Sequence, residues 1–245
     1  MNITADEKQM YQVMKALYES GIPICFKGSM VLKACLNEAG YVDEVRRTVD
    51  IDANWNSEEP PTAEQLVSSL QSVLDRNNLQ IDVQMFRMYA EDRSAGFMLT
   101  DRTTGAELFS IDMDVNRPMP ETRLYEIAGL SFRGVSPTQM IADKVSAVSS
   151  NKVFRRVKDV IDLYYISKAF PFPKEAVLQA LKNGGRTLDS FDGFLKRQDE
   201  LRHAYDKFRL CAQTRVCSLT GESPVYPRPN QPDISESWDG ISNGA

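Results

Sequence analysis

The sequence predicts an α+β fold, in which a mixed β-sheet flanked by helices is followed by a helical C-terminal region. In the first half, short apolar runs typical of strands alternate with segments of helical periodicity. After Ser136 the strand signals stop and helical patterns continue. The composition, 42% hydrophobic and 26% charged over 245 residues, is that of a globular protein long enough to bury a substantial core.

The first half begins with Thr4-x-x-Glu7, the pattern of a capping box, which predicts a helix that Gly21 ends. A helix is expected over 30–38, and another opens at Thr62 after two prolines. The expected strands are, in order, 22–26, one within 46–55, 79–85, 95–100, 106–115, and a hairpin within 125–135 around Ala128-Gly129.

The second half opens with Ser136-Pro137-x-Gln139, which has a capping serine and a proline at the first helical position. Helices are expected over 137–149, 154–169, 174–183 and 188–211. We therefore expect three parts: a sheet-containing domain over 1–135, a helical domain over 136–217, and an extended or disordered tail over 218–245 with four prolines and few apolar residues.

The N-terminus is polar and acidic, and no apolar run approaches the length of a membrane span, so a cytoplasmic protein with no membrane partner is expected. A net charge of −5 argues against a globally basic nucleic-acid-binding surface, although a local basic patch stays open. The four cysteines form no C-x-x-C pair and the chain has one histidine, which disfavours a zinc site.

Two strands carry pairs of aspartates with the spacing of a metal site. Asp50 and Asp52 point to the same face of their strand, where they repel each other unless a divalent cation such as Mg²⁺ or Mn²⁺ binds them. Asp112 and Asp114 repeat the pattern, and if the two strands are neighbours, three or four carboxylates converge. The alternative for each pair alone is a solvated strand face.

Two further segments have the chemistry to bind phosphate. Gly28-Ser29, between a strand and a helix, would let the helix N-terminus bind an anion; alternatively it is an ordinary turn with Ser29 as the cap. Lys144 and Asp159 lie on consecutive helices next to the most basic stretch of the chain, 152–158. The basic residues of this segment could bind a polyphosphate or nucleic-acid backbone, or the segment could be a solvated face with local ion pairs.

Together these motifs resemble those of the nucleotidyltransferase (polymerase beta-like) superfamily. Their particular residues, in this order, look like those of the AbiEii/AbiGii toxin family, including the MenT-type toxins. The resemblance runs from about residue 20 to 170. It implies a minimal nucleotidyltransferase domain followed by a helical domain. By position, the resemblance implies that Gly28, Ser29 and Lys144 bind the nucleotide, that Asp50 and Asp52 bind metal, and that Asp159 is an active-site acid. It also implies a third carboxylate, Asp114 or Asp112, which would share a second metal or polarise the attacking hydroxyl. Many members have Gly-Gly in place of Gly28-Ser29, and the chain from about residue 185 matches no pattern.

The expected function is a metal-dependent nucleotidyltransferase, with Mg²⁺ or Mn²⁺ as cofactor and an NTP as substrate. The resemblance further implies that it is the toxin of a toxin–antitoxin or phage-defence system. The resemblance implies a nucleic-acid acceptor, with the tRNA 3′ end as the acceptor of MenT-type members, and a cognate antitoxin partner. Two alternatives stay open at this point. One is a non-catalytic binding module with the same fold, and the other is transfer of NMP to a protein hydroxyl.

Overall fold

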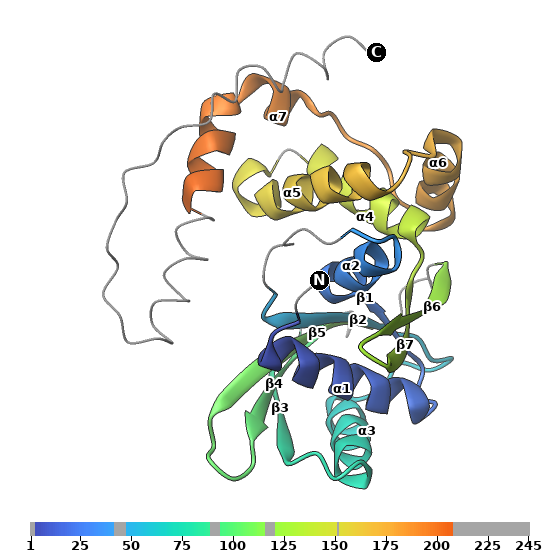
Figure 1. The fold of residues 1–245 in the computed structure, drawn as a ribbon, viewed down its shortest axis with the longest axis vertical. Coiled ribbons are helices and arrows are strands. Elements are labelled where there is room, and N and C mark those ends of the chain that lie inside the picture. Colours follow the sequence, from blue (N-terminus) through green and yellow to red (C-terminus); the bar gives the residue numbers. More distant parts are fainter. Residues whose placement is uncertain (1–2, 42–47, 89–93, 116–120, 151, 208–245) are drawn as a thin grey trace. The chain divides into compact units, whose positions relative to one another are not determined.

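The computed structural model describes residues 3–41, 48–88, 94–115, 121–150 and 152–207 (Figure 1). One compact unit extends to Tyr205. The predicted tail over 218–245, the preceding residues 208–217, and Cys211 and Cys217 lie outside the described residues.

The helices and strands follow the predicted order. They are α1 (Ala5–Glu19), β1 (Ile24–Lys27), α2 (Gly28–Glu38), β2 (Asp50–Trp55), α3 (Ala63–Arg76), β3 (Ile81–Met88), β4 (Ser94–Asp101), β5 (Glu107–Val115), β6 (Thr122–Ile127), β7 (Leu130–Val135), α4 (Pro137–Ser149), α5 (Val153–Ala169), α6 (Lys174–Asn183) and α7 (Asp192–Lys196).

The strands form one seven-stranded sheet in the order β3-β4-β5-β2-β1-β7-β6. The pairs β2–β5 and β1–β7 are parallel, whereas the other neighbours are antiparallel. The predicted α+β class with a mixed sheet and flanking helices is confirmed. The hairpin of β6 and β7 turns at Ala128 and Gly129, whose φ angles of 52° and 73° match the two-residue turns that strand twist favours.

Alternation along the strands separates an apolar face from a polar face of the sheet. In β5, Ile111, Met113 and Val115 are buried, whereas the residues between them are partly exposed. The apolar face packs against helices, and an aromatic cluster of Tyr11 on α1 with Phe132 on β7 lies in this core. We define the polar face as the side that carries Lys27, Asp50, Asp52, Asp112 and Asp114, because these residues occupy alternate positions on adjacent strands.

The helical half begins where the sequence predicts. Ser136 accepts a hydrogen bond from the Gln139 N–H, and α4 spans the predicted residues. Helices α4 and α5 both contact α2, of which residues 29–36 are all buried. Sheet and helical half therefore share one compact unit, and the domain boundary at 135/136 stays a prediction. None of the helices in the described ranges is long and apolar enough to span a membrane.

Two helix predictions were wrong in detail. Helix α2 begins at Gly28 with Lys27 as its N-cap, so Ser29 lies inside the helix and is not its cap. The single helix expected over 188–211 is broken: residues 184–191 are not helical, α7 has five residues, and helical structure resumes at 198–207. Phe194 on α7 packs with Val148 of α4, a tertiary contact that the helical periodicity of residues 188–211 does not encode.

Candidate active site

The register of the sheet brings the two aspartate pairs together. In the parallel pair β2–β5, Asp50 lies opposite Ser110 and Asp52 lies opposite Asp112. Asp114 is one step further along, opposite Asn54. Paired residues on adjacent strands share a face, so all four carboxylates belong to the polar face. The expectation that the two strands are neighbours is therefore met, and the register favours Asp112 over Asp114 as the partner of Asp52.

Gly28 allows the start of α2 to approach Asp52. Its φ is +70°, a conformation that residues with a side chain rarely adopt. A Cβ built at Gly28 would lie 1.9 Å from Asp52 Oδ2 and 2.7 Å from Asp52 Cγ, so a larger residue would displace the carboxylate. The N-cap residue Lys27 makes no side-chain capping bond. The N-terminus of α2, where backbone N–H groups lack intrahelical partners, thus lies beside the acid pair.

A chain of hydroxyl groups fixes Asp50. The hydroxyl groups of Ser29 and Thr48 are hydrogen-bonded at 2.7 Å, and Thr48 Oγ1 also lies 3.1 Å from Asp50 Oδ1. Because a hydroxyl can donate and accept at once, Thr48 can donate to the carboxylate while it accepts from Ser29. Both Ser29 and Thr48 are buried. The sequence analysis assigns no role to Thr48, although Thr48 lies only two residues before Asp50, the first residue of β2.

Two cations lie among the carboxylates. Lys27 Nζ forms an ion pair with Asp114 Oδ2, and Arg87 of β3 forms one with Asp112 Oδ1. Within the described part of the chain, neither Asp50 nor Asp52 forms an ion pair. The two carboxylates of β5 are therefore paired with cations, whereas the negative charge of the two carboxylates of β2 is not compensated by an ion pair among the described residues.

This charge perturbs Asp52 in particular. Burial raises its pKa to about 6, and the neighbouring charge of Asp50 contributes to the increase. The charges of Lys158 and Lys27 act in the opposite direction. Lys158 belongs to α5, so its charge links the helical half to the acid pair. The sequence analysis gives Lys158 no role in the site.

Lys144 lies near Asp159, as the sequence predicts, but its closest partner is a third residue, Asp162. Lys144 Nζ lies 2.6 Å from Asp162 Oδ2 and 3.5 Å from Asp159 Oδ1, while Arg156 approaches the other oxygen of Asp159 at 3.4 Å. The side chains of Lys144, Asp159 and Asp162 are 8%, 10% and 0% exposed. The alternative of a surface ion pair is therefore wrong, and Asp162 was missed as the nearest partner of Lys144.

The donors on β2 fit a hard divalent cation in part. Asp50 and Asp52 supply carboxylate oxygens on one face, and the buried Oδ1 of Asn54, two residues further, accepts no hydrogen bond from the described residues. No group of three His, Cys, Asp or Glu side chains is arranged for a metal among those residues. Mg²⁺ in nucleotide-dependent enzymes is commonly held by one or two carboxylates together with substrate phosphates and water. Asp50 and Asp52 satisfy that lower requirement.

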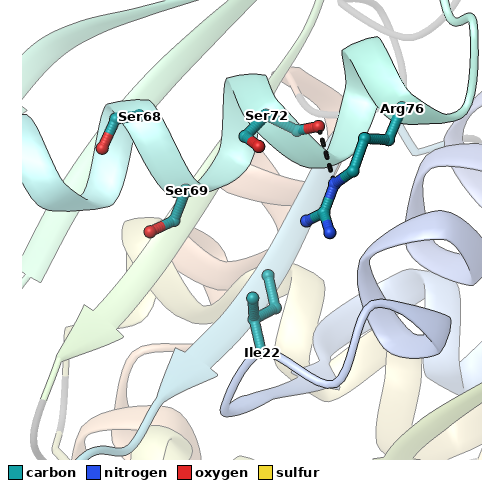
Figure 2. Close-up of a pocket in the computed structure, with 5 residues that line it drawn as sticks. All are labelled: Ile22, Ser68, Ser69, Ser72 and Arg76. Carbon is teal, nitrogen blue, oxygen red and sulfur yellow. Dashed lines mark hydrogen bonds between the residues drawn. The ribbon is translucent and has the colours of Figure 1, made fainter.

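A separate surface depression of about 420 Å³ lies beside α3. Figure 2 shows its lining: Ile22 and, on α3, Ser68, Ser69, Ser72 and Arg76. Arg76 Nε donates a hydrogen bond to the carbonyl oxygen of Ser72 on its own helix. The depression contains none of the predicted site residues and no carboxylate, so the polar face is the better candidate for chemistry.

The family of the chain follows from comparison with known proteins. Residues 12–215 match the family model described as "Nucleotidyl transferase AbiEii toxin, Type IV TA system", and the chain belongs to this family. The resemblance inferred from the motifs is confirmed, but the match also covers the residues after 185, where the sequence analysis found no pattern.

Two solved structures are similar to this chain. MenT4, a nucleotidyltransferase toxin from Mycobacterium tuberculosis H37Rv, is 15% identical with a TM-score of 0.49, over 70% of this chain and 60% of that one. An antigenic nucleotidyltransferase-like protein from Paracoccidioides brasiliensis is 18% identical with a TM-score of 0.48, over 82% of this chain and 93% of that one. The chain thus spans less than two thirds of the MenT4 chain. No curated protein matches.

Proposed function

We propose that this protein is a metal-dependent nucleotidyltransferase that transfers NMP from an NTP to a nucleic-acid hydroxyl, and that it acts as the toxin of a toxin–antitoxin system. One observation carries the proposal: the N-terminus of α2 lies against Asp52, with no room for a side chain at Gly28. An anion-binding helix terminus and a carboxylate pair are the two components that a metal-bound triphosphate requires. Membership of the AbiEii family supports the same reaction class.

In this proposal Asp50 and Asp52 hold Mg²⁺ or Mn²⁺, which would neutralise charge on the phosphates when bound. Gly28 presents backbone N–H groups to the triphosphate, and Ser29 helps to hold Asp50 in place through Thr48. These residues carry the nucleotide-binding part of the reaction, which depends mainly on positioning and electrostatics.

The acceptor side of the proposal rests on β5. Asp112 lies opposite Asp52 in the register and is the better candidate for the third carboxylate, which would polarise the attacking hydroxyl. Asp114 is bound to Lys27 and is proposed to orient that cation. Lys144, held by Asp162 and Asp159, is proposed to contribute positive charge near the phosphates. The tRNA 3′ end is the acceptor that the family resemblance favours, and a cognate antitoxin is the proposed partner.

The test is incubation of the purified protein with each labelled NTP, Mg²⁺ and total cellular RNA and protein, followed by gel separation. We expect label in RNA, and none of it in chelator or with Asp50→Ala plus Asp52→Ala. The matched control is Asp75→Ala plus Asp82→Ala, which removes two exposed carboxylates from Arg102 and should leave transfer intact. Label found only in protein would indicate that the acceptor is a protein hydroxyl and not RNA. NTP binding without transfer would favour the non-catalytic binding module.

A further inference from the structure

Strand β3 contains an irregularity next to the polar face. Met85 pairs with Phe97 of β4 and Arg87 pairs with Gly96, so Phe86 is an extra residue in a β-bulge. In a regular strand Phe86 and Arg87 would point to opposite faces. The bulge instead directs both toward one face, which is a common effect of bulges beside functional sites.

Gly96 shows which face this is. Gly96 pairs with Asp112, so its missing side chain would point to the polar face. A Cβ at Gly96 would lie 2.8 Å from Cζ of the Phe86 ring and 3.2 Å from two further ring atoms. The Cζ end of the ring therefore lies against Gly96 on the polar face, in a space that only glycine leaves open.

The ring combines exposure with a specific charged environment. Phe86 is 53% exposed although it is a large apolar residue. The guanidinium carbon of Arg87 lies 5.3 Å from the ring centroid, and the same guanidinium binds Asp112. Gly96 lies two strands from Asp52, which corresponds to about 10 Å across the sheet. An aromatic face, a cation and the proposed third carboxylate thus lie side by side.

We propose that Phe86 and Arg87 form a stacking site for a nucleobase of the acceptor strand. Exposed aromatic rings and arginine planes are the groups on which proteins stack unpaired bases. The site deepens the proposed function and rests on it, because it names how the acceptor is held.

The position of Phe86 in the sheet favours the base of the acceptor strand, and not the base of the incoming nucleotide, as the group that stacks on it. Gly28 and the N-terminus of α2 lie on the β1 side of Asp52, where the triphosphate and leaving pyrophosphate are proposed to bind. In-line displacement requires the attacking hydroxyl to approach from the opposite side. Asp112, Gly96 and Phe86 follow one another on that opposite side.

The experiment compares variants of the full chain for binding to a short single-stranded RNA with a free 3′ hydroxyl, by fluorescence anisotropy. Phe86→Ala and Phe86→Leu should weaken RNA binding roughly tenfold or more, because both remove the aromatic face. Phe86→Trp should retain binding. Phe172→Ala is the matched control, since Phe172 is similarly exposed at 56% but lies between α5 and α6, and it should bind RNA as the wild type does.

A second variant tests the geometry without removal of the ring. Gly96→Ala keeps Phe86 but places a methyl group where the ring lies, so it should show the same defect while its thermal unfolding confirms that it folds. In transfer assays Phe86→Ala and Gly96→Ala should each raise the KM for RNA and leave the KM for the NTP unchanged.

Three results with the variants would overturn the inference. They are wild-type RNA affinity in Phe86→Ala, an equal loss in Phe172→Ala, and a defect confined to the KM for the NTP, which would move the stacked base to the incoming nucleotide. Failure of the wild type to bind RNA would also refute it. If that wild type still binds Mg²⁺-NTP and transfers the label to protein, the nucleotidyltransferase proposal survives with another acceptor.

Discussion

Asp52 is the residue at which folding and chemistry conflict most. Its pKa is raised from 3.8 to about 6 by burial and by Asp50, so the folded state binds this proton more tightly than the unfolded state does. The stabilising contribution is complete below about pH 4 and is lost as the pH rises through about 6. At pH 8 the ionised carboxylate therefore destabilises the metal-free fold, by roughly 1–3 kcal/mol on this shift.

Asp52→Asn should accordingly raise the melting temperature of the metal-free protein at pH 8 by a few degrees and abolish nucleotide transfer. At pH 4 the difference from wild type should nearly vanish. The control is Asp75→Asn, because hydrogen bonds from Arg102 hold the pKa of Asp75 below its usual value and predict the opposite sign. Calorimetry across this pH range in chelator gives the answer, and a wild-type melting temperature for Asp52→Asn at pH 8 would contradict the conflict described.

The ion cluster around Lys144 leads to a different residue-scale prediction. On the sequence alone, Lys144→Ala is expected to leave stability unchanged, but the side chain is buried against Asp162, which is fully buried. To remove one partner of a buried ion pair typically costs about 3–5 kcal/mol. Lys144→Ala and Asp162→Asn should both lower the denaturation midpoint, and Asp159→Asn, at 3.5 Å and near Arg156, should lower it less.

The double variant Lys144→Met plus Asp162→Asn checks this explanation. It removes both members of the closest pair, so it should be more stable than the single variants Lys144→Met and Asp162→Asn while transfer stays low. Additive losses in urea unfolding would show that the two side chains act independently and would argue against a coupled pair.

At the scale of the element, the start of α2 depends on a glycine for two separable reasons. Gly28 needs both a positive φ and an empty space beside Asp52, whereas Gly21 has a φ of +76° and a Cβ added there would meet nothing within 4 Å. Gly21→Ala should therefore lose only the backbone contribution, about 1–2 kcal/mol. Gly28→Ala should lose more and should also weaken Mg²⁺-NTP binding in calorimetry. Equal stability losses with intact NTP binding in both variants would remove the close-approach argument.

Elements also show what a sequence can and cannot predict. Helix α4 and the hairpin at Ala128-Gly129 were predictable, because a cap and a turn are encoded by adjacent residues. The shared face of Asp50 and Asp52 followed from strand periodicity alone. The proposed preference for Asp112 over Asp114 did not follow from the sequence, because it rests on the register of β2 and β5, two strands far apart in the chain.

The remaining site residues depended on tertiary structure in the same way. Arg87 and Phe86 share a face only because of a bulge, and Thr48 gains its role only from the position of Ser29 on α2. Asp162 received no role from the sequence, because helical spacing alone does not reveal which of two acids lies nearer to Lys144 on the neighbouring helix.

At the scale of the whole molecule, the sheet and the helical half depend on each other through α2. A helix that packs only on a sheet buries one face and exposes the other. In α2 every residue from Ser29 to Leu36 is buried, because α4 and α5 contact the helix as well. A fragment that ends at Val135 would therefore expose an apolar helix face that the full chain covers.

Such a fragment, 1–135, should fail to unfold cooperatively and should bind a hydrophobic dye, even though it contains every strand of the described sheet and both aspartate pairs. A fragment of residues 1–205, which keeps the whole compact unit, should unfold in one transition within a few degrees of the full chain. Differential scanning calorimetry of the two fragments separates the possibilities. A single sharp transition for 1–135 would show that the sheet is an independent domain, and that the helical half contributes to the site by contact without supporting the fold.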